Sequence, residues 1–336
     1  MIDSHDIDRP DGDIPQSGGE SANPTGAGPI RLKTRVYRPH RGKTVLEFLC
    51  ERFKYHPRRT WIDRIESGSI RLNGRVAQAD DIVDANDVIE YEIDIVEPEV
   101  DFSYDTLYED DDLIAVSKSG NIPVHASGNY IRHTLIARVR ADLREKVHLC
   151  HRLDRETSGI VLLARNVEAR REMGRAFEDG KIRKSYVAIV RGVPGKDAFM
   201  CSRALRKIGK QHPIPRTVVD DRTGKPARTT FRVLERLGEF SVIGARPETG
   251  RTNQVRVHLE VAGHPIVGDK TYGLPARLLR QMVAAPNDAD VRAHLILPRH
   301  ALHHVRMQFA HPMSGVRVTI EAPVPEDMSR FIRSLR

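Results

Sequence analysis

The chain has 336 residues and a net charge of +8, with 54 Lys and Arg against 46 Asp and Glu. This length is enough for two or three domains with cores of their own. No apolar run approaches the ~18 residues of a membrane span, and the first residues carry acids in place of the apolar segment of a secretory signal. The sequence therefore excludes a membrane-spanning protein and predicts no membrane partner.

The three cysteines lie far apart, at Cys50, Cys150 and Cys201, without a C-x-x-C spacing. Such a pattern forms neither a disulfide framework nor a zinc site. A reducing compartment suits unpaired thiols, so we expect a cytoplasmic protein.

Charge is unevenly distributed along the chain. Residues 1–29 hold six acids and a single base, Arg9, and are rich in Asp, Gly, Pro and Ser with no aromatic residue. We predict that residues 1–30 form a disordered acidic tail, because such a composition buries too little apolar surface to offset its ordering entropy. The remainder carries 53 basic against 40 acidic side chains. A surplus near +13 indicates a polyanionic partner.

Residues 31–97 are predicted to form a small separate α/β module. Apolar residues from Val45 to Phe53 recur at helical spacing, and Trp61 to Ile65 predict a second helix that ends at Gly68. Asn73-Gly74 is the strongest short hairpin signal, and residues 87–93 alternate as a strand does. Seven bases lie in this stretch: Arg52, Lys54, Arg58, Arg59, Arg64, Arg71 and Arg75. They form either an RNA-binding surface or a solvated charged face.

Residues 98–336 read as a second, larger domain that is rich in strands with interspersed helices. Strands are predicted at 113–116, 160–164, 186–190, 231–234, 240–245, 302–309 and 316–320, and helices at 131–145, 166–178 and 255–262. Such a mixture indicates an α+β fold with a mixed, largely antiparallel sheet. Residues 203–228 hold many bases together with Pro and Gly, and we predict a mobile, RNA-facing loop there.

The most informative stretch is His-Arg-Leu-Asp-Arg-Glu-Thr-Ser-Gly at residues 151–159, directly before the apolar run 160–164. Arg152 and Arg155 flank Asp154, and nearby cations favour the ionised carboxylate. An ionised Asp beside a buried strand can act as a nucleophile or a base, or it can form a structural salt bridge.

This string resembles the signature of the RluA-type pseudouridine synthases. Four further segments resemble that family in the same order: Tyr108–Asp111 with Val116–Lys118 and Pro123–His125, then Lys184–Gly192, then Thr249–His258 continuing to Gly273, then Leu302-His303 with His311-Pro312. The resemblance covers residues 105–325. Three positions depart from the family: Ser119 replaces a Pro, Asn253 a His, and His304 a small residue. Residues 42–93 resemble the S-four-like RNA-binding domain.

The resemblance implies the pseudouridine synthase fold and the isomerisation of uridine in RNA, without a cofactor or a metal. Asp154 would be the nucleophile or base, Arg256 would pair with it, and Tyr186 would stack on the base. Arg152 would fill the gap that a flipped uridine leaves in the RNA. The other expected RNA contacts are Arg155, Arg251, Asn253 and Gln254, with Arg58, Arg59, Arg64, Arg71 and Arg75 in the N-terminal module.

Several alternatives remain open at this point. Arg256 could instead contact phosphate, and Tyr186 could be a core residue. The whole protein could be an RNA-binding relative without activity, or a carboxylate-dependent hydrolase or metal-dependent nuclease, although the surroundings of Asp154 supply mainly bases. The expected substrate is large-subunit ribosomal RNA, with transfer RNA as the alternative, and the expected state is a monomer.

Overall fold

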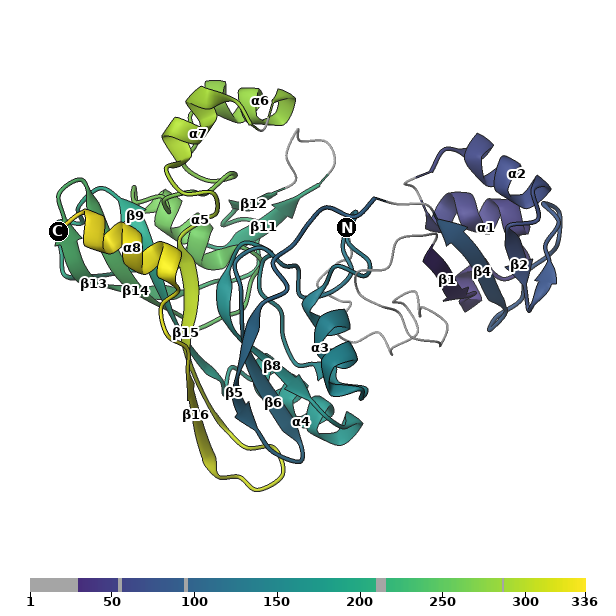
Figure 1. Cartoon of the computed structure of the whole chain (residues 1–336), viewed down its shortest axis with the longest axis horizontal. Coiled ribbons are helices and arrows are strands. Elements are labelled where there is room, and N and C mark those ends of the chain that lie inside the picture. The colour runs from purple at the N-terminus through teal and green to yellow at the C-terminus, as the bar shows by residue number, and fades with distance from the viewer. Residues whose placement is uncertain (1–29, 54–55, 94–95, 210–215, 286) are drawn as a thin grey trace. The chain divides into compact units, whose positions relative to one another are not determined.

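The computed structural model describes residues 30–336 except 54–55, 94–95, 210–215 and 286. The predicted disordered tail therefore lies almost entirely outside the described residues. The chain divides into two compact units, one reaching to Pro98 and including Ala126–His133, the other made of Glu99–His125 and Thr134–Arg336 (Figure 1). Each helix in the described part of the chain is too short or too polar to cross a membrane.

The N-terminal unit is a four-stranded antiparallel sheet, in the order β1-β4-β2-β3, with two helices. A capping box begins α1, where the Thr44 hydroxyl accepts from the Glu47 N–H and the Glu47 carboxylate accepts from the Thr44 N–H. Asn73 and Gly74 both take positive φ in the predicted hairpin. Its elements are β1 (Ile30–Arg35), the 3-10 helix η2 (Arg38–His40), α1 (Val45–Arg52), α2 (Arg58–Glu66), β2 (Ile70–Leu72), β3 (Arg75–Val76) and β4 (Val88–Ile93).

Residues 126–133 belong to this unit although they lie far along the chain. The carboxylate of Glu97 accepts hydrogen bonds from the backbone N–H groups of Ile131, Arg132 and His133, at 2.6 to 3.0 Å. The helix predicted over 131–145 therefore begins later, at Leu135, where the hydroxyl of Thr134 caps it.

The C-terminal unit is built on a ten-stranded mixed sheet that is mostly antiparallel, as predicted. Along its main path the order is β10-β13-β14-β9-β15-β8-β6-β5, with β16 beside β15 and β7 beside β8. The strands of this sheet are β5 (Tyr104–Glu109), β6 (Leu113–Lys118), β7 (His148–Leu149), β8 (Ser158–Ala164), β9 (Arg183–Arg191), β10 (Ala198–Cys201), β13 (Thr229–Leu237), β14 (Phe240–Pro247), β15 (Leu302–Ala310) and β16 (Arg317–Glu321). A separate two-stranded sheet is formed by β11 (Leu205–Ile208) and β12 (Arg216–Val219). The helices are α3 (Leu135–Leu143), α4 (Val167–Glu178), α5 (Gln254–Val261), α6 (Ala276–Ala284), α7 (Ala289–Leu295) and α8 (Glu326–Ser334).

Strands β6 and β8 are buried on both faces. Leu113 and Ile160 share one core cluster with Met173 of α4, whereas their neighbours Ile114 and Val161 share another with α3. This explains why β8 is a continuous apolar run and not an alternating one. Helices α5 and α8 pack on the other half of the sheet through a third cluster, which contains Val255, Leu259 and Met328 (Figure 1).

The two halves of the sheet meet where β15 runs parallel to β8. Only two residue pairs form this ladder, His303 with Ser158 and His304 with Gly159. Gly159 has φ +105°, and a Cβ there would lie 2.3 Å from the carbonyl oxygen of His304. Glycine is therefore required at the last position of residues 151–159, which we call the Asp154 segment, for the two halves of the sheet to join.

One prediction is wrong in the C-terminal unit. Part of the predicted loop at 203–228 is an antiparallel ribbon, in which β11 pairs with β12. Leu205 packs with Val257 and Tyr272 in a small cluster. This contact was not predicted because basic residues surround Leu205 in the sequence. Helices α6, α7 and α8 were not predicted; α6 and α7 share a small core of their own, which contains Leu278, Val291 and Leu295.

Candidate active site

Asp154 lies in the turn between β7 and β8. The backbone N–H of Thr157 donates to its carbonyl at 3.1 Å, and the neighbouring Leu153 is buried and anchors the turn in the core. The Asp154 side chain keeps 29% of its surface exposed. The carboxylate is thus held by a rigid support and remains open to a ligand.

Arg256 reaches Asp154 from α5. Its Nη1 lies 2.9 Å from Oδ2 of Asp154, while its Nε and Nη2 donate to the two oxygens of Asp269 at 2.7 and 2.8 Å. The side chain of Asp269 is fully buried. Burial acts to lower the pKa of Arg256, but the charge and hydrogen bonds of Asp269, with the charge of Asp154, outweigh it and raise the pKa. The guanidinium therefore stays charged and fixed in orientation beside Asp154.

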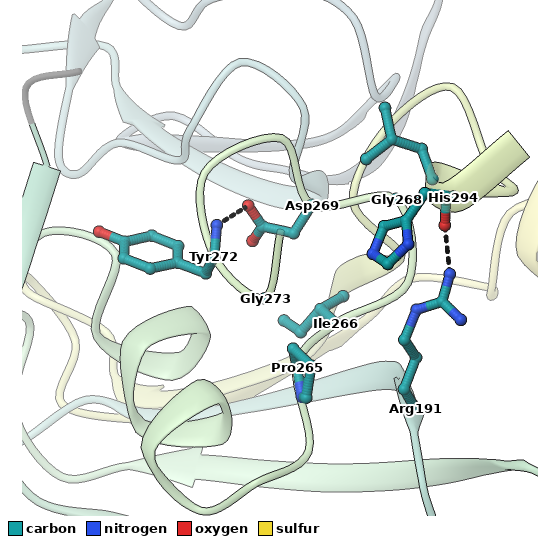
Figure 2. Close-up of a pocket in the computed structure, with 9 residues that line it drawn as sticks. Arg191, Pro265, Ile266, Gly268, Asp269, Tyr272, Gly273 and His294 are labelled. Carbon is teal, nitrogen blue, oxygen red and sulfur yellow. Dashed lines mark hydrogen bonds between the residues drawn. The ribbon is translucent and has the colours of Figure 1, made fainter. Parts of the chain in front are cut away.

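The loop after α5 holds Asp269 in place. Backbone N–H groups of Thr271 and Tyr272 donate to its Oδ1 at 2.8 and 3.0 Å. Figure 2 shows the bond from Tyr272. Gly268 precedes it with φ +78°, and a Cβ there would lie 2.0 Å from the carbonyl oxygen of Arg299. A cavity of about 10 Å³ opens between this loop and His294, enough for one water molecule and far too small for a nucleotide.

Asn253 lies in the left-handed region, with φ +55°, directly before α5. With the amide nitrogen toward Asp154, that nitrogen lies 2.9 and 3.2 Å from the carboxylate oxygens, and the amide oxygen accepts from the Tyr272 hydroxyl at 3.1 Å. The reverse orientation would set the amide oxygen against the carboxylate, so we assign the first. Asn253 therefore contacts the candidate catalytic residue itself, whereas the sequence predicted an RNA contact.

Tyr186 is half-buried on β9, and its ring stacks on that of His304 with centroids 4.5 Å apart. Burial, and after it the negative charge of Asp154, raise the pKa of the Tyr186 hydroxyl. The hydroxyl therefore stays protonated at neutral pH beside the carboxylate. Asp154 and Arg256, which lie far apart in sequence, are thus in direct contact, and Tyr186 lies within the electrostatic influence of Asp154.

Sequence reasoning assigned no role to Lys118, the last residue of β6. It is almost completely buried, and its Nζ donates to the carbonyls of Ser119 and Arg155, both at 2.9 Å. Burial, and after it the charge of Arg299, lower the pKa of Lys118 to about 7. The sequence offered one signal for this residue, a lysine at the end of an apolar strand. In the structure, this lysine contacts the turn that holds Asp154 through the carbonyl of Arg155.

The other residues predicted around Asp154 differ in their surroundings. Arg152 is exposed, and its Nη1 lies 3.2 Å from Nε2 of His125. Burial, and after it the charge of Arg152, lower the pKa of His125 to about 4, so its ring is neutral and accepts this bond. Arg155 pairs with Glu156 at 3.1 Å, and Arg251 donates to the carbonyl of Pro226.

Gln254 is buried, and its amide is hydrogen-bonded within the protein. Its Oε1 accepts from the hydroxyl of Thr249 and the N–H of Arg251, and its Nε2 donates to Thr229 and to the carbonyl of Arg228. We therefore assign Gln254 to holding this loop and not to RNA contact.

In the N-terminal unit, the predicted RNA-binding bases fall into two groups. Arg58, Arg59 and Arg71 are exposed, although Arg59 also pairs with Asp63. Arg75 is held by both oxygens of Asp81, and Arg64 donates to the carbonyl of Glu92.

Asp110, Asp112 and His311 offer ligand atoms within 4.8 Å of one another, a grouping that the sequence analysis did not identify. Contacts among these side chains and the nearby backbone account for their closeness without a metal ion. The Nδ1 of His311 accepts from two backbone N–H groups, so its Nε2 carries the proton and faces Asp110 at 3.0 Å. Asp110 also accepts from the hydroxyl of Tyr108.

Residues 112–261 match the family described as RNA pseudouridylate synthase. Ribosomal large subunit pseudouridine synthase D of Xylella fastidiosa is 31% identical over 298 residues, covering 86% of this chain and 87% of that protein. The protein of the same name from Pasteurella multocida is 30% identical and covers 91% and 95%. The chain belongs to the RluA family of RNA pseudouridine synthases. The predicted family and enzyme class are therefore confirmed.

The family's fold is also present. The human protein titled RNA Pseudouridylate Synthase Domain Containing 4 superposes with a TM-score of 0.53, covering 69% of this chain and 92% of that one at 24% identity. Human RNA Pseudouridylate Synthase Domain Containing 1 gives a TM-score of 0.52 and covers 72% and 98%. The predicted α+β pseudouridine synthase fold is confirmed, together with a small N-terminal antiparallel sheet.

Proposed function

We propose that this RNA pseudouridine synthase isomerises particular uridines of large-subunit ribosomal RNA, with Asp154 as the reacting carboxylate. The observation that carries the proposal is the partly exposed Asp154 carboxylate, which Arg256 holds at 2.9 Å. The charge of this carboxylate also acts on the hydroxyl of Tyr186, whose pKa it helps to raise. The ribosomal substrate is supported by relatives named ribosomal large subunit pseudouridine synthase D, 30% and 31% identical. Transfer RNA is the alternative substrate.

Isomerisation breaks the carbon–nitrogen bond to the base, turns the base, and forms a carbon–carbon bond in its place. The net reaction moves no electrons to an acceptor and carries no group between molecules, so the proposal includes no cofactor. The ionised carboxylate of Asp154 attacks the ribose or the pyrimidine ring, or assists departure of the base. All three routes need a carboxylate held in one orientation, and Arg256 and Asn253 provide two such contacts.

Tyr186 and Arg152 supply the other two parts of the proposed mechanism. The Tyr186 ring stacks on the flipped uracil, and its protonated hydroxyl lies in the field of Asp154 and can relay a proton. Arg152, exposed beside the Asp154 turn, fills the space that the uridine leaves in the RNA, which offsets the few kcal/mol that extrusion of a base costs. Arg155 and Arg251 contact the neighbouring phosphates.

The N-terminal unit is proposed to bind RNA as an S-four-like domain through Arg58, Arg59 and Arg71, with Arg64 and Arg75 contributing positive potential. We propose domain limits of 31–97 and 98–336 along the chain, with residues 126–133 of the second segment packing in the first unit. We also propose a monomeric enzyme and action in the cytoplasm.

Release of tritium from RNA labelled at C5 of uridine tests the proposal, because the new bond forms at that carbon. Wild-type protein should release tritium from a large-subunit ribosomal transcript and not from transfer RNA. Asp154→Asn keeps the shape of the side chain but removes its charge, so release should fall at least about 1000-fold while RNA affinity stays within about twofold. Asp142→Asn, an acid on α3 that pairs with Arg138, is the matched control and should remain active.

Two outcomes would contradict the proposal. Release at the wild-type rate from Asp154→Asn would remove Asp154 from the reaction. RNA binding without tritium release by the wild-type protein, over a set of ribosomal and transfer RNAs, would favour an RNA-binding relative without activity. Mapping the pseudouridines missing from a strain that lacks the protein identifies the uridines themselves.

A further inference from the structure

His304 lies at the joint between the two halves of the C-terminal sheet. It is fully buried on β15 and is the direct cross-strand neighbour of Tyr186 on β9. On its other side it pairs with Gly159 of β8, the last residue of the Asp154 segment. His304 thus lies between β9, which carries Tyr186, and β8, which follows the turn that holds Asp154.

The imidazole is oriented by one hydrogen bond and one stacking contact. Its Nδ1 donates to the carbonyl of Ile160 at 2.8 Å, and its ring lies 4.5 Å from that of Tyr186 at an interplanar angle of 16°. Two aromatic rings in this arrangement attract one another beyond the burial of their surfaces. Burial lowers the pKa of His304 to about 3, so the ring is neutral.

Within the part of the chain that the structure describes, the other ring nitrogen forms no hydrogen bond that would stabilise the fold. Nε2 of His304 is buried and has no hydrogen-bond partner among the described residues. A buried acceptor without a partner is destabilising. This nitrogen therefore gives no reason of stability for a histidine at this position, and the contacts of the ring have to be considered.

His304 also touches the Asp154 segment through a second ring. His151, the first residue of that segment, meets His304 edge to face with centroids 5.9 Å apart at 85°. The Nε2 of His151 in turn accepts from the backbone N–H of Leu162 in β8. One neutral ring therefore contacts Tyr186 on one strand and the segment that carries Asp154 on another.

We propose that His304 is a positioning residue that fixes the ring of Tyr186 relative to Asp154. This inference rests on the proposed function, because its effect on turnover acts through Tyr186. With one face of Tyr186 covered by His304, the uracil stacks on the opposite face, and the three rings form a single stack. The hydroxyl of Tyr186 then has one orientation toward the reacting carboxylate.

A double-mutant cycle on turnover tests the coupling. His304→Ala should lower kcat about tenfold with little change in KM, and His304→Phe should restore most of the loss because it restores the stacked ring. In a Tyr186→Leu background, His304→Ala should cause no further loss. Equal fold losses in the two backgrounds, or no rescue by His304→Phe, would overturn the proposal. His303→Ala controls for lost packing, since His303 contacts Ser158 and the carbonyl of Ala322 instead.

A spectroscopic measurement tests the same contact without activity. The protein is labelled on its tyrosine rings for NMR. The signal of Tyr186 is assigned as the one that disappears from the spectrum of Tyr186→Phe. A stacked imidazole shifts the Tyr186 ring protons upfield, and this shift should vanish in His304→Ala and persist in His304→Phe. An unchanged Tyr186 signal in a folded His304→Ala protein would overturn the stack. This result is independent of the tritium assay, so failure of the proposed function and failure of this inference are distinguishable.

Discussion

Asp269 holds Arg256 through both of its carboxylate oxygens, at 2.7 and 2.8 Å, and does so from a completely buried position. Arg256 therefore reaches Asp154 with only one nitrogen, Nη1, and its direction is decided by Asp269. Asp269→Asn should lower kcat about 10- to 100-fold, because the amide keeps the shape but loses one acceptor and the compensating charge. The buried guanidinium of Arg256 then lacks the negative charge of Asp269, which should lower the free energy of unfolding by ~3–5 kcal/mol.

Asp327→Asn is the matched control for that prediction. Asp327 holds Arg299 through two contacts of 2.7 and 2.9 Å, but it is partly exposed and touches none of the proposed catalytic residues. Chemical denaturation and tritium release should show that Asp327→Asn loses stability and keeps its rate per folded molecule. If both variants lose the same fraction of their activity, Asp269 has no special part in orienting Arg256.

Asn253 can be tested by changing its charge without changing its shape. Asn253→Asp sets a second carboxylate within about 3 Å of Asp154, and kcat should fall at least about 100-fold. Asn253→Gly retains the left-handed backbone, since glycine adopts positive φ readily, and should lose only about tenfold. Steady-state kinetics on one RNA compares the two; a glycine variant as slow as the aspartate variant would argue against repulsion as the cause.

Lys118 should make stability depend on pH in the alkaline range. In the folded protein burial lowers its pKa to about 7, against 10.5 for the unfolded chain. Between these values the unfolded chain binds more protons, so this residue makes stability rise with pH. The destabilising effect of burying the charge is fully present below about pH 7 and has disappeared by about pH 10.5.

Lys118→Met removes that titration, although it also removes two hydrogen bonds. The free energy of unfolding of the wild type minus that of the variant should therefore rise between pH 7 and 10, by up to ~1.4 kcal/mol per pH unit. Urea denaturation at several pH values measures this difference. The exposed Lys196→Met should give a profile parallel to the wild type; a parallel profile for Lys118→Met as well would mean that Lys118 titrates normally.

The N-terminal bases should appear in the salt dependence of RNA affinity. Arg58→Gln with Arg59→Gln removes two exposed charges at the start of α2. If both contact phosphates, the slope of log affinity against log salt should become shallower by about 1.4 to 1.8. Arg330→Gln with Arg333→Gln on α8 removes a similar exposed pair and should leave the slope unchanged. Equal slopes for all three proteins would mean that α2 does not bind RNA.

Sequence patterns predicted most of the fold because the cores follow local periodicity. The apolar run of β8, the amphipathic pattern of α4 and the Asn73-Gly74 turn are all readable over a few residues. The ribbon at β11 and β12 was missed because its few apolar residues pack against Val257 and Tyr272, far along the chain. Helix α8 was missed for the same reason, as Met328 is buried only by its packing on the distant sheet.

A residue of the candidate site could be predicted from the sequence where it stands in a motif, and not where its proposed part depends on contact with a distant residue. Asp154, Arg256 and Tyr186 stand in recognisable motifs. Asp269 and Lys118 also lie in such segments, but their parts depend on contacts with residues 13 and 37 positions away. Gln254 is a residue whose predicted role differs from its surroundings in the structure. Its polar side chain was predicted to face RNA, but it is buried and hydrogen-bonded within the protein.

The joint between β8 and β15 has a consequence for how the protein is made. Its contacts link residues 156–160 to residues 299–304: Arg299 with the carbonyl of Glu156, Thr157 with His300, Ser158 with His303, and His304 with the carbonyl of Ile160. A growing chain at residue 290 already contains Asp154, Tyr186, Arg256 and Asp269, yet it lacks the strand that joins the two halves of the sheet. The proposed active site can therefore form only after residues 299–304 have been synthesised, and a shorter nascent chain holds the proposed reacting groups without the strand that aligns them.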